Sequence, residues 1–323
     1  MTKADLFSES AFSALQWVAA VLPDQSGRTA IVTGANRGLG FLTAQAMAHC
    51  GAHVVMTARD ERRGRNAMAQ ILATRPRGTV ELRFLDLADL VDVRRFAEKF
   101  LHDGLPLDVL VNNAGVMMVP HGLTRQGYEL QFGVNHLAHF LLTALLLKRL
   151  AQSRDGRVVT VTSSLHKEGR IRFDDLHGKR RYGPVAFYAQ SKLANALFSL
   201  ELDRRVRAVG LPVRSVLAHP GFAATNVHLN GPTGLLGIFM KFGNRYVAQS
   251  PAIAVLSQLY AAMAPSIEGG QFFGPNGEYE VRGLPCAVEP APAAKDAVLA
   301  HRLWALSEQL IGEHCDPAVH LEA

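Results

Sequence analysis

The chain has 323 residues, which suits one large α/β domain or two small ones. Hydrophobic residues make up 48% of it and charged residues 19%, a balance that excludes disorder over most of the length. The net charge of +6 is too small, on a chain of this length, to indicate nucleic-acid binding by itself. It favours an anionic partner, such as a phosphorylated cofactor.

The cysteines and the uncharged stretches bear on the compartment. Cys50, Cys286 and Cys315 form no CxxC pair and no disulfide framework, which favours a reducing, cytoplasmic setting. The first 23 residues lack the unbroken apolar run of a signal peptide. Two uncharged stretches, 41–58 and 130–147, each contain a glutamine and two histidines, so we expect buried elements there and no membrane span.

Short apolar runs alternate with helical patterns along the chain. Strands are expected at 29–33, 53–58, 80–85, 107–111, 157–162, 213–217 and 271–273. Helices are expected at 39–50, 60–74, 91–100, 130–151, 188–209 and 297–311. This alternation predicts an α/β fold with a doubly wound (Rossmann), mostly parallel sheet and helices on both faces.

We expect an N-terminal extension at 1–26 and a single domain over 27–323. The glycine-rich apolar stretch at about 222–250 interrupts the alternation, and such insertions shape ligand pockets, so it is interpreted as a lid. Residues 276–323 form a C-terminal tail in this interpretation.

A glycine-rich turn follows the first strand, at 33–40. Its spacing is GxxxGxG rather than GxGxxG, but glycines in either pattern let the backbone approach a pyrophosphate at a helix N-terminus. The alternative is a purely structural turn. The expected cofactor contacts in the turn are Gly34, Asn36, Arg37, Gly38, Leu39 and Gly40.

The end of the second strand bears on which dinucleotide binds. An acidic side chain here would bind the ribose 2′-hydroxyl of NAD, but Ala58 is neutral and Arg59 follows it. Arg37 and Arg59 could converge on a 2′-phosphate, which favours NADP(H). The negative charges of Asp60 and Glu61 argue against a phosphate site here. The alternative is that Arg59 belongs to a solvated helix face.

Tyr188 and Lys192 are spaced i, i+4, so they share one helix face. A nearby ammonium lowers a tyrosine pKa, so the phenol could exchange a proton with a carbonyl or alcohol near neutral pH. The alternative is a surface lysine beside a packed tyrosine. Ser163 and Ser164 close the fifth strand at its carboxyl end, where such sheets bind ligands.

Two amide-bearing segments complete the set. Asn112, Asn113, Ala114 and Gly115 follow the fourth strand and leave room for a cofactor or form an Asx-type turn. Asn135 lies in a mostly apolar helix, where a buried amide must find partners; structural capping and catalytic support are both open.

Taken in their order along the chain, these motifs resemble those of the short-chain dehydrogenase/reductase family over roughly residues 27–275. The chain looks most like its retinol-dehydrogenase-like branch, on the segments at 33–40, 58–60, 130–136, 188–195 and 219–221. Further matching residues are Asp86, Leu87, Asn113, Ala114, Gly115, Pro220, Gly221 and Thr225, which the resemblance implies are cofactor contacts together with Tyr188 and Lys192.

The resemblance also implies roles for four catalytic residues. Ser164, preferred over Ser163, hydrogen-bonds the substrate oxygen, and Tyr188 exchanges the proton with it. Lys192 holds the nicotinamide ribose and lowers the tyrosine pKa, and Asn135 supports a water in a proton relay. The nicotinamide carries the hydride, and no metal is expected.

We therefore expect an NADP(H)-dependent oxidoreductase acting on an alcohol or carbonyl compound. A non-catalytic NADPH sensor and a nucleic-acid binder are the alternatives. The apolar residues at 234–240 indicate either a pocket for a lipophilic substrate, a membrane contact, or a lid helix packed on the core. Polar residues interrupt the apolar residues at 6–21 too often for a membrane anchor.

An apolar stripe near the N-terminus predicts a docked amphipathic helix, with peripheral membrane contact as the alternative. The stripe comprises Ala11, Phe12, Leu15, Val18, Ala19 and Leu22. A homo-oligomer is compatible with the resemblance but is not predicted from the residues.

Overall fold

The computed structural model describes residues 21–222 and 249–317. Thr225, the apolar residues at 234–240, nearly all of the expected lid and the stripe at 11–19 lie outside the described residues. Leu22, the last member of that stripe, is buried in the core.

One eight-stranded sheet runs through the protein in the order β3-β2-β1-β4-β5-β6-β7-β8. Its strands are β1 (Thr29–Val32), β2 (His53–Ala58), β3 (Thr79–Phe84), β4 (Val109–Asn112), β5 (Gly156–Val161), β6 (Val213–Ala218), β7 (Phe272–Pro275) and β8 (Pro285–Ala287). The first seven pair in parallel, and β8 pairs antiparallel with β7. The expected doubly wound, mostly parallel sheet is confirmed.

The expected helices are present, with shifts of a few residues at their ends. They are α2 (Gly38–His49), α3 (Glu61–Ala73), α4 (Leu90–His102), α5 (Leu130–Phe132), α6 (Ala138–Ala151), α7 (Pro184–Ala208) and α11 (Ala297–Ile311). Helix α7 begins four residues earlier than expected, because Pro184 has the backbone angle that the first turn of a helix requires. Three elements were not predicted from the sequence: α9 (Pro251–Ala254), α10 (Leu256–Met263) and strand β8.

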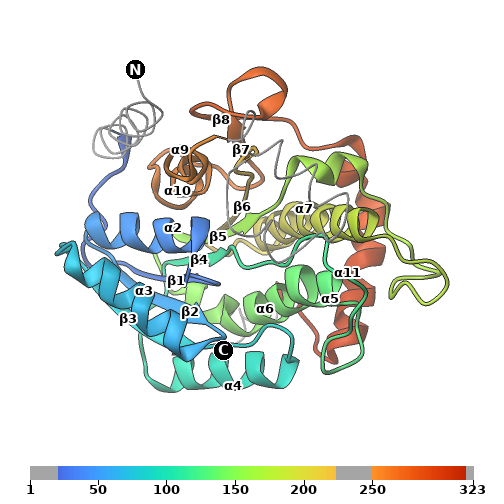
Figure 1. Ribbon diagram of the computed structural model, residues 1–323, viewed down its shortest axis with the longest axis horizontal. Coiled ribbons are helices and arrows are strands. Elements are labelled where there is room, and N and C mark those ends of the chain that lie inside the picture. The colour runs from blue at the N-terminus through green and yellow to red at the C-terminus, as the bar shows by residue number, and fades with distance from the viewer. Residues whose placement is uncertain (1–20, 223–248, 318–323) are drawn as a thin grey trace.

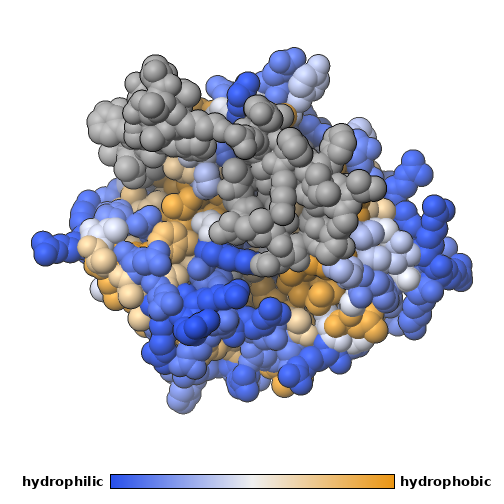
Figure 2. Space-filling view, viewed as in Figure 1, coloured by the Kyte–Doolittle hydropathy of each residue, from blue (hydrophilic) through white to orange (hydrophobic). Residues whose placement is uncertain are grey.

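Each face of the sheet has its own hydrophobic core. Because neighbouring residues of a strand face opposite sides, Leu110 and Phe272 pack with α4, α6, α7 and α11, while Val111 and Phe273 pack with α2, α3 and α10. Figure 1 shows α4 and α6 on one side of the sheet and α2 and α10 on the other. Figure 2 shows a largely hydrophilic rim on the face in view.

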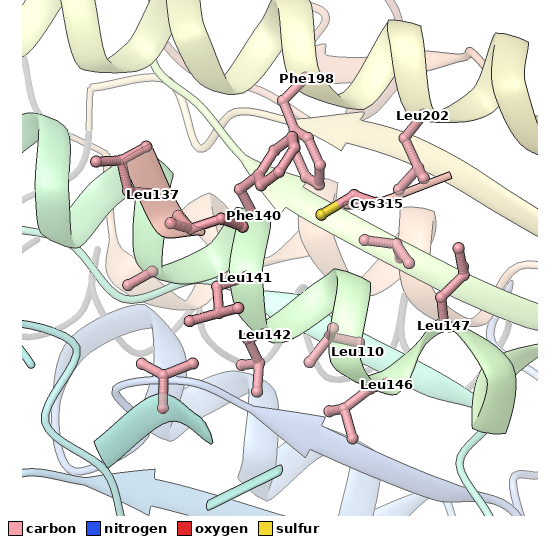
Figure 3. Close-up of a cluster of buried hydrophobic side chains, with 14 of the residues drawn as sticks. Leu110, Leu137, Phe140, Leu141, Leu142, Leu146, Leu147, Phe198, Leu202 and Cys315 are labelled. Carbon is pink, nitrogen blue, oxygen red and sulfur yellow. The ribbon is translucent and has the colours of Figure 1, made fainter. Parts of the chain in front are cut away.

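The long apolar segment at 130–151 is a core helix with an irregular start. Its first turn, α5, runs through a π-helical turn (Gly133–Leu137) into α6. The segment is long and apolar enough to cross a membrane, but 83% of its apolar 18-residue window is buried inside the protein. Phe140 of α6 and Phe198 of α7 have ring centroids 5.4 Å apart, and Figure 3 shows both within the surrounding leucine cluster.

The order of the strands locates the crevice where ligands bind. After β1 the chain adds strands outward on one side, β2 and β3, and then crosses to β4 on the other side of β1. The loops that leave β1 and β4 therefore diverge to opposite faces, which opens a crevice at the carboxyl ends of the strands.

Candidate active site

A cavity of about 420 Å³ opens at this crevice. It brings together most of the residues expected to bind the cofactor or react. Its lining includes Gly34, Asn36, Arg37, Gly38, Leu39, Gly40, Asn113, Ala114, Gly115, Ser163, Ser164, Tyr188, Lys192, Pro220 and Gly221. Arg59, Asp86, Leu87 and Asn135 do not line it, and Thr225 lies outside the described residues.

The glycine turn packs closely against the loop after β4. Gly34 has φ +65°, and a Cβ there would lie 2.9 Å from the Ala114 Cβ. A Cβ on Gly40 would lie 2.5 Å from Asn113 Nδ2. Thr33 Oγ1 accepts hydrogen bonds from the backbone N–H groups of Asn113 and Ala114, both at 2.9 Å. The backbone at the start of α2 is therefore held open towards the cavity, where an anion would meet the helix N-terminus.

Three guanidinium groups gather beside this turn. Partial burial lowers the pKa of Arg37, and the positive charges of Arg63 and Arg59 lower it further, although Arg37 as a whole is exposed. Like charges repel, so their approach costs free energy, which the Asp60 carboxylate, 3.5 Å from Arg63 Nε, offsets only in part. The sequence pointed to Arg37 and Arg59 but not to Arg63, which lies in the first turn of α3 and whose charge acts on Arg37.

Tyr188 and Lys192 project from α7 into the cavity, as their spacing predicted. Lys192 Nζ lies 5.7 Å from the centre of the Tyr188 ring and donates a 3.0 Å hydrogen bond to the Val161 carbonyl. Both side chains are buried, with 8% of Tyr188 and 4% of Lys192 exposed. Thr162 Oγ1 donates to the Lys192 carbonyl at 2.8 Å, which holds this turn of α7 against the end of β5.

Burial controls the protonation of this pair. It raises the pKa of Tyr188 to about 12, opposed by a side-chain hydrogen bond with Ser163. It lowers the pKa of Lys192 from 10.5 to about 8. The expected lowering of the tyrosine pKa by Lys192 is not resolved in this structure, where burial dominates and the Lys192 ammonium is directed at a backbone carbonyl.

Asn135 lies behind the cavity, in the π-helical turn. Its Oδ1 accepts from Val116 N at 2.8 Å, and its Nδ2 donates to Val116 O and to Ser191 Oγ, both at 2.9 Å. The amide thus ties the loop after β4 to α7. A Cβ on Gly115 would lie 3.1 Å from Asn135 Oδ1 and 3.7 Å from Lys192 Nζ, so glycine keeps the space beside both groups open.

Asp86 and Leu87 follow β3, farther out along the sheet. Asp86 Oδ1 accepts from Ala88 N at 3.0 Å, and Leu87 is buried. Both lie at the carboxyl ends of the strands, but the cavity does not reach them.

Residues 28–231 match the family described as short chain dehydrogenase. The chain belongs to the short-chain dehydrogenase/reductase family. It is an oxidoreductase of alcohol and carbonyl groups, and relatives of it are named as dehydrogenases. Mouse polyprenol dehydrogenase is 43% identical over 298 residues, covering 90% of this chain and 86% of that protein. Human retinol dehydrogenase 13 is 40% identical over 294 residues, covering 88% and 85%.

These relatives place the dehydrogenase/reductase in the retinol-dehydrogenase-like branch, as its motifs indicated. An uncharacterised Mycobacterium paratuberculosis protein of known structure is 44% identical, with a TM-score of 0.74 over 93% of this chain and 98% of that one. The Pseudomonas aeruginosa RhlG/NADP complex has a TM-score of 0.62 at 22% identity, covering 79% and 97%, and shares the fold.

The structure bears on the choice of serine in this dehydrogenase/reductase. Ser163, not Ser164, is the serine whose side chain interacts with Tyr188 and opposes the rise of its pKa. Ser163 keeps the extended backbone that leaves β5, whereas Ser164 starts a 3-10 turn (Ser164–Glu168) and is exposed. This geometry favours Ser163 over Ser164, although both line the cavity.

His139 is a buried contributor that the sequence did not reveal. Its Nδ1 lies 3.1 Å from the Asn135 carbonyl, which can only accept, so Nε2 accepts from Thr33 Oγ1 at 3.0 Å. Burial lowers the pKa of His139 to about 4, which keeps the ring neutral. The imidazole therefore connects the glycine turn to the turn that carries Asn135.

Substituting the two serines separately tests this preference. Ser163→Ala is expected to lower kcat/KM for a carbonyl substrate by about 10²–10³-fold, the usual cost of losing a hydrogen-bond donor to the developing oxyanion. Ser164→Ala is the matched control and is expected to stay within about twofold. Steady-state reduction assays measure both. The reverse ranking would return the role to Ser164.

Proposed function

We propose that this protein is an NADP(H)-dependent oxidoreductase that acts on a lipophilic alcohol or carbonyl compound. The proposal rests on one observation. Ser163, Tyr188 and Lys192 line the same cavity as the glycine turn at the start of α2, so a bound dinucleotide and a reacting oxygen would share it. A nicotinamide, when bound, supplies the hydride chemistry that these side chains cannot.

The preference for a 2′-phosphate is supported by the arginine cluster. Arg37, Arg59 and Arg63 would gain a shared dianion between them, which offsets their mutual repulsion. The two acids that argued against this preference are already engaged. Asp60 caps α3 by accepting from Arg63 N at 2.9 Å, and Glu61 accepts from Arg65 Nε at 2.9 Å.

The protonation states support a reductive direction. A tyrosine whose pKa is about 12 is a neutral phenol at physiological pH and can donate a proton to a carbonyl oxygen. Ser163 is placed to hydrogen-bond the same oxygen. The space beside Gly115, bordered by Asn135 Oδ1 and Lys192 Nζ, suits a water that returns the proton to the tyrosine.

The cavity wall supports a lipophilic substrate. Five apolar side chains line the cavity beside the reacting groups: Val116, Met117, Met118, Leu165 and Phe222. Polyprenol and retinol, named in the relatives, are lipophilic alcohols. Methionine side chains are adaptable and suit long apolar chains of varied shape.

The cellular compartment and the contact with a membrane remain predictions. The three cysteines Cys50, Cys286 and Cys315 are free thiols, in keeping with a reducing, cytoplasmic compartment. Peripheral contact with a membrane would bring a lipophilic substrate to the cavity and remains part of the proposal.

Cofactor titration tests the proposal. Arg37→Ala and Arg59→Ala are each expected to weaken NADPH binding about 10- to 100-fold, as for the loss of a charge-assisted contact, with NADH binding unchanged. Arg65→Ala is the control, because Arg65 pairs with Glu61. Fluorescence titration measures the affinities, and turnover of long-chain aldehydes and ketones follows. A parent protein that prefers NADH contradicts the phosphate assignment, and NADPH binding without any turnover favours a sensor.

A further inference from the structure

The loop between β7 and β8 reaches the rim of the cavity. Phe222 N donates to the Val281 carbonyl at 2.8 Å, and a Cβ on Gly221 would lie 2.4 Å from that oxygen. Gln249 adds a second link, because Gly283 N donates to its Oε1 at 3.0 Å and its Nε2 donates to the Pro220 carbonyl at 2.6 Å. The loop thus supports the turn at 219–222, which lines the cavity.

Glu280, at the centre of this loop, contacts two elements at once. Gly221 N donates to His219 Nδ1 at 3.3 Å, so the ring proton is on Nε2, which lies 3.0 Å from Glu280 Oε2. The other carboxylate oxygen accepts from Lys167 Nζ at 2.8 Å. His219 is fully buried, and a Cβ on Gly274 would lie 2.1 Å from its Nε2, so the ring has little freedom to move.

Lys167 connects this carboxylate to the catalytic serine. It lies in the 3-10 turn Ser164–Glu168, for which Ser163 is the N-cap residue. His166 of the same turn is buried, with Nδ1 2.7 Å from the Ser163 carbonyl and Nε2 accepting from Ala291 N at 3.0 Å. The serine turn is therefore held by its own backbone on one side and by Glu280 on the other.

Two further observations mark Glu280 as more than a surface charge. Its backbone has φ +57° and that of Tyr279 has φ +53°, a left-handed conformation that costs free energy in residues other than glycine. The contacts with His219 and Lys167 lower the pKa of Glu280 to about 2, so it is ionised at physiological pH.

We propose that Glu280 is a positioning residue that braces the serine turn (163–168) against the turn at 219–222, and so sets the width of the cavity between Ser163 and Gly221. It touches neither substrate nor cofactor and acts through His219 and Lys167. The proposal rests on the proposed function, because a fixed separation of these turns matters only if substrate and cofactor meet between them.

Glu280→Gln tests the brace, because it keeps the shape of the side chain but removes the charge that Lys167 and His219 share. We expect kcat to fall about 10-fold or more, with NADPH affinity within about threefold, because only Pro220 and Gly221 of the expected cofactor contacts lie in the two braced turns. Amide hydrogen exchange is expected to rise in 163–168 and 219–222 together and not elsewhere. Glu278→Gln is the matched control: it removes an exposed charge from the same loop and should change neither.

A double-substitution cycle of Glu280→Gln with Lys167→Met should be non-additive in kcat. Unchanged kcat and exchange in Glu280→Gln, in a protein that Tyr188→Phe inactivates, would overturn the brace and leave the proposed function standing. Faster exchange throughout the chain would show general destabilisation and also overturn it. If the parent protein turns over no substrate, the proposed function fails, and the paired exchange in the two turns decides the brace alone.

Discussion

Tyr188→Phe is expected to lower kcat for carbonyl reduction by about 10²–10⁴-fold, the usual contribution of a positioned proton donor. The ring still fills its place between Ser163 and Lys192, so NADPH affinity and the thermal midpoint should change little. The loss should be equal in kcat and kcat/KM, because the proton moves only in the transition state.

The control for this substitution is Tyr279→Phe, which removes a hydroxyl from a side chain that is 84% exposed and outside the cavity. Its kcat should match that of the parent. Because the pKa of Tyr188 is about 12, the parent rate of reduction should show no loss of this proton donor between pH 6 and pH 9. Retention of activity in Tyr188→Phe would contradict the catalytic assignment.

Lys192→Met is expected to abolish turnover while making the protein more stable. A lysine pKa lowered from 10.5 to about 8 corresponds to about 3 kcal/mol in favour of the neutral form when the protein is folded. The methionine also loses the hydrogen bond to the Val161 carbonyl, worth about 1 kcal/mol. A net gain of about 1–2 kcal/mol should raise the thermal midpoint by roughly 2–8 °C.

The pH dependence of this stability gives a second readout. Below about pH 8 both the folded and unfolded states carry the proton on Lys192, so the folded state bears the whole cost of the buried charge. Between about pH 8 and 10.5 only the unfolded state keeps the proton, so the free energy of unfolding rises with pH. Lys192→Met should remove that rise.

Differential scanning calorimetry at pH 7 and pH 9.5 measures both effects, with NADPH turnover assayed alongside. Lys148→Met is the matched control, because Lys148 is exposed on α6 and its loss should shift stability by less than about 0.5 kcal/mol. A parent protein that is as stable as Lys192→Met at both pH values would contradict the buried charge.

Much of the fold follows from local patterns. The apolar runs that became β1 to β7 are short and bounded by polar residues or glycine, so they were predicted to within two residues or so at most ends. Helices α9 and α10 were missed, because they lie in apolar sequence without the alternation that separates a helix from a strand. Strand β8 has three residues, too few for a periodic signal.

The candidate site divides in the same way. The spacing of Tyr188 and Lys192 and the glycines of the turn place these residues through helix geometry and backbone freedom, which are local. Ser163 and Ser164 could not be separated from the sequence, because the choice depends on which side chain faces a helix 25 residues further along the chain. The contribution of Arg63 depends on its distance from Arg37, which belongs to a different βα unit.

The sequence alone determined the candidate reactive residues, the doubly wound sheet that carries them and the family to which the chain belongs. Residue type, spacing and hydrophobic period determine these features, and all three are local properties. Which serine faces the tyrosine, the direction in which the Tyr188 pKa moves and the link from Glu280 to both turns were decided only by the tertiary structure. These depend on desolvation and on contacts between distant segments, such as the contact of Lys167 with Glu280, which lies 113 positions later in the chain. Neither desolvation nor a contact between distant segments produces a repeating pattern in the sequence.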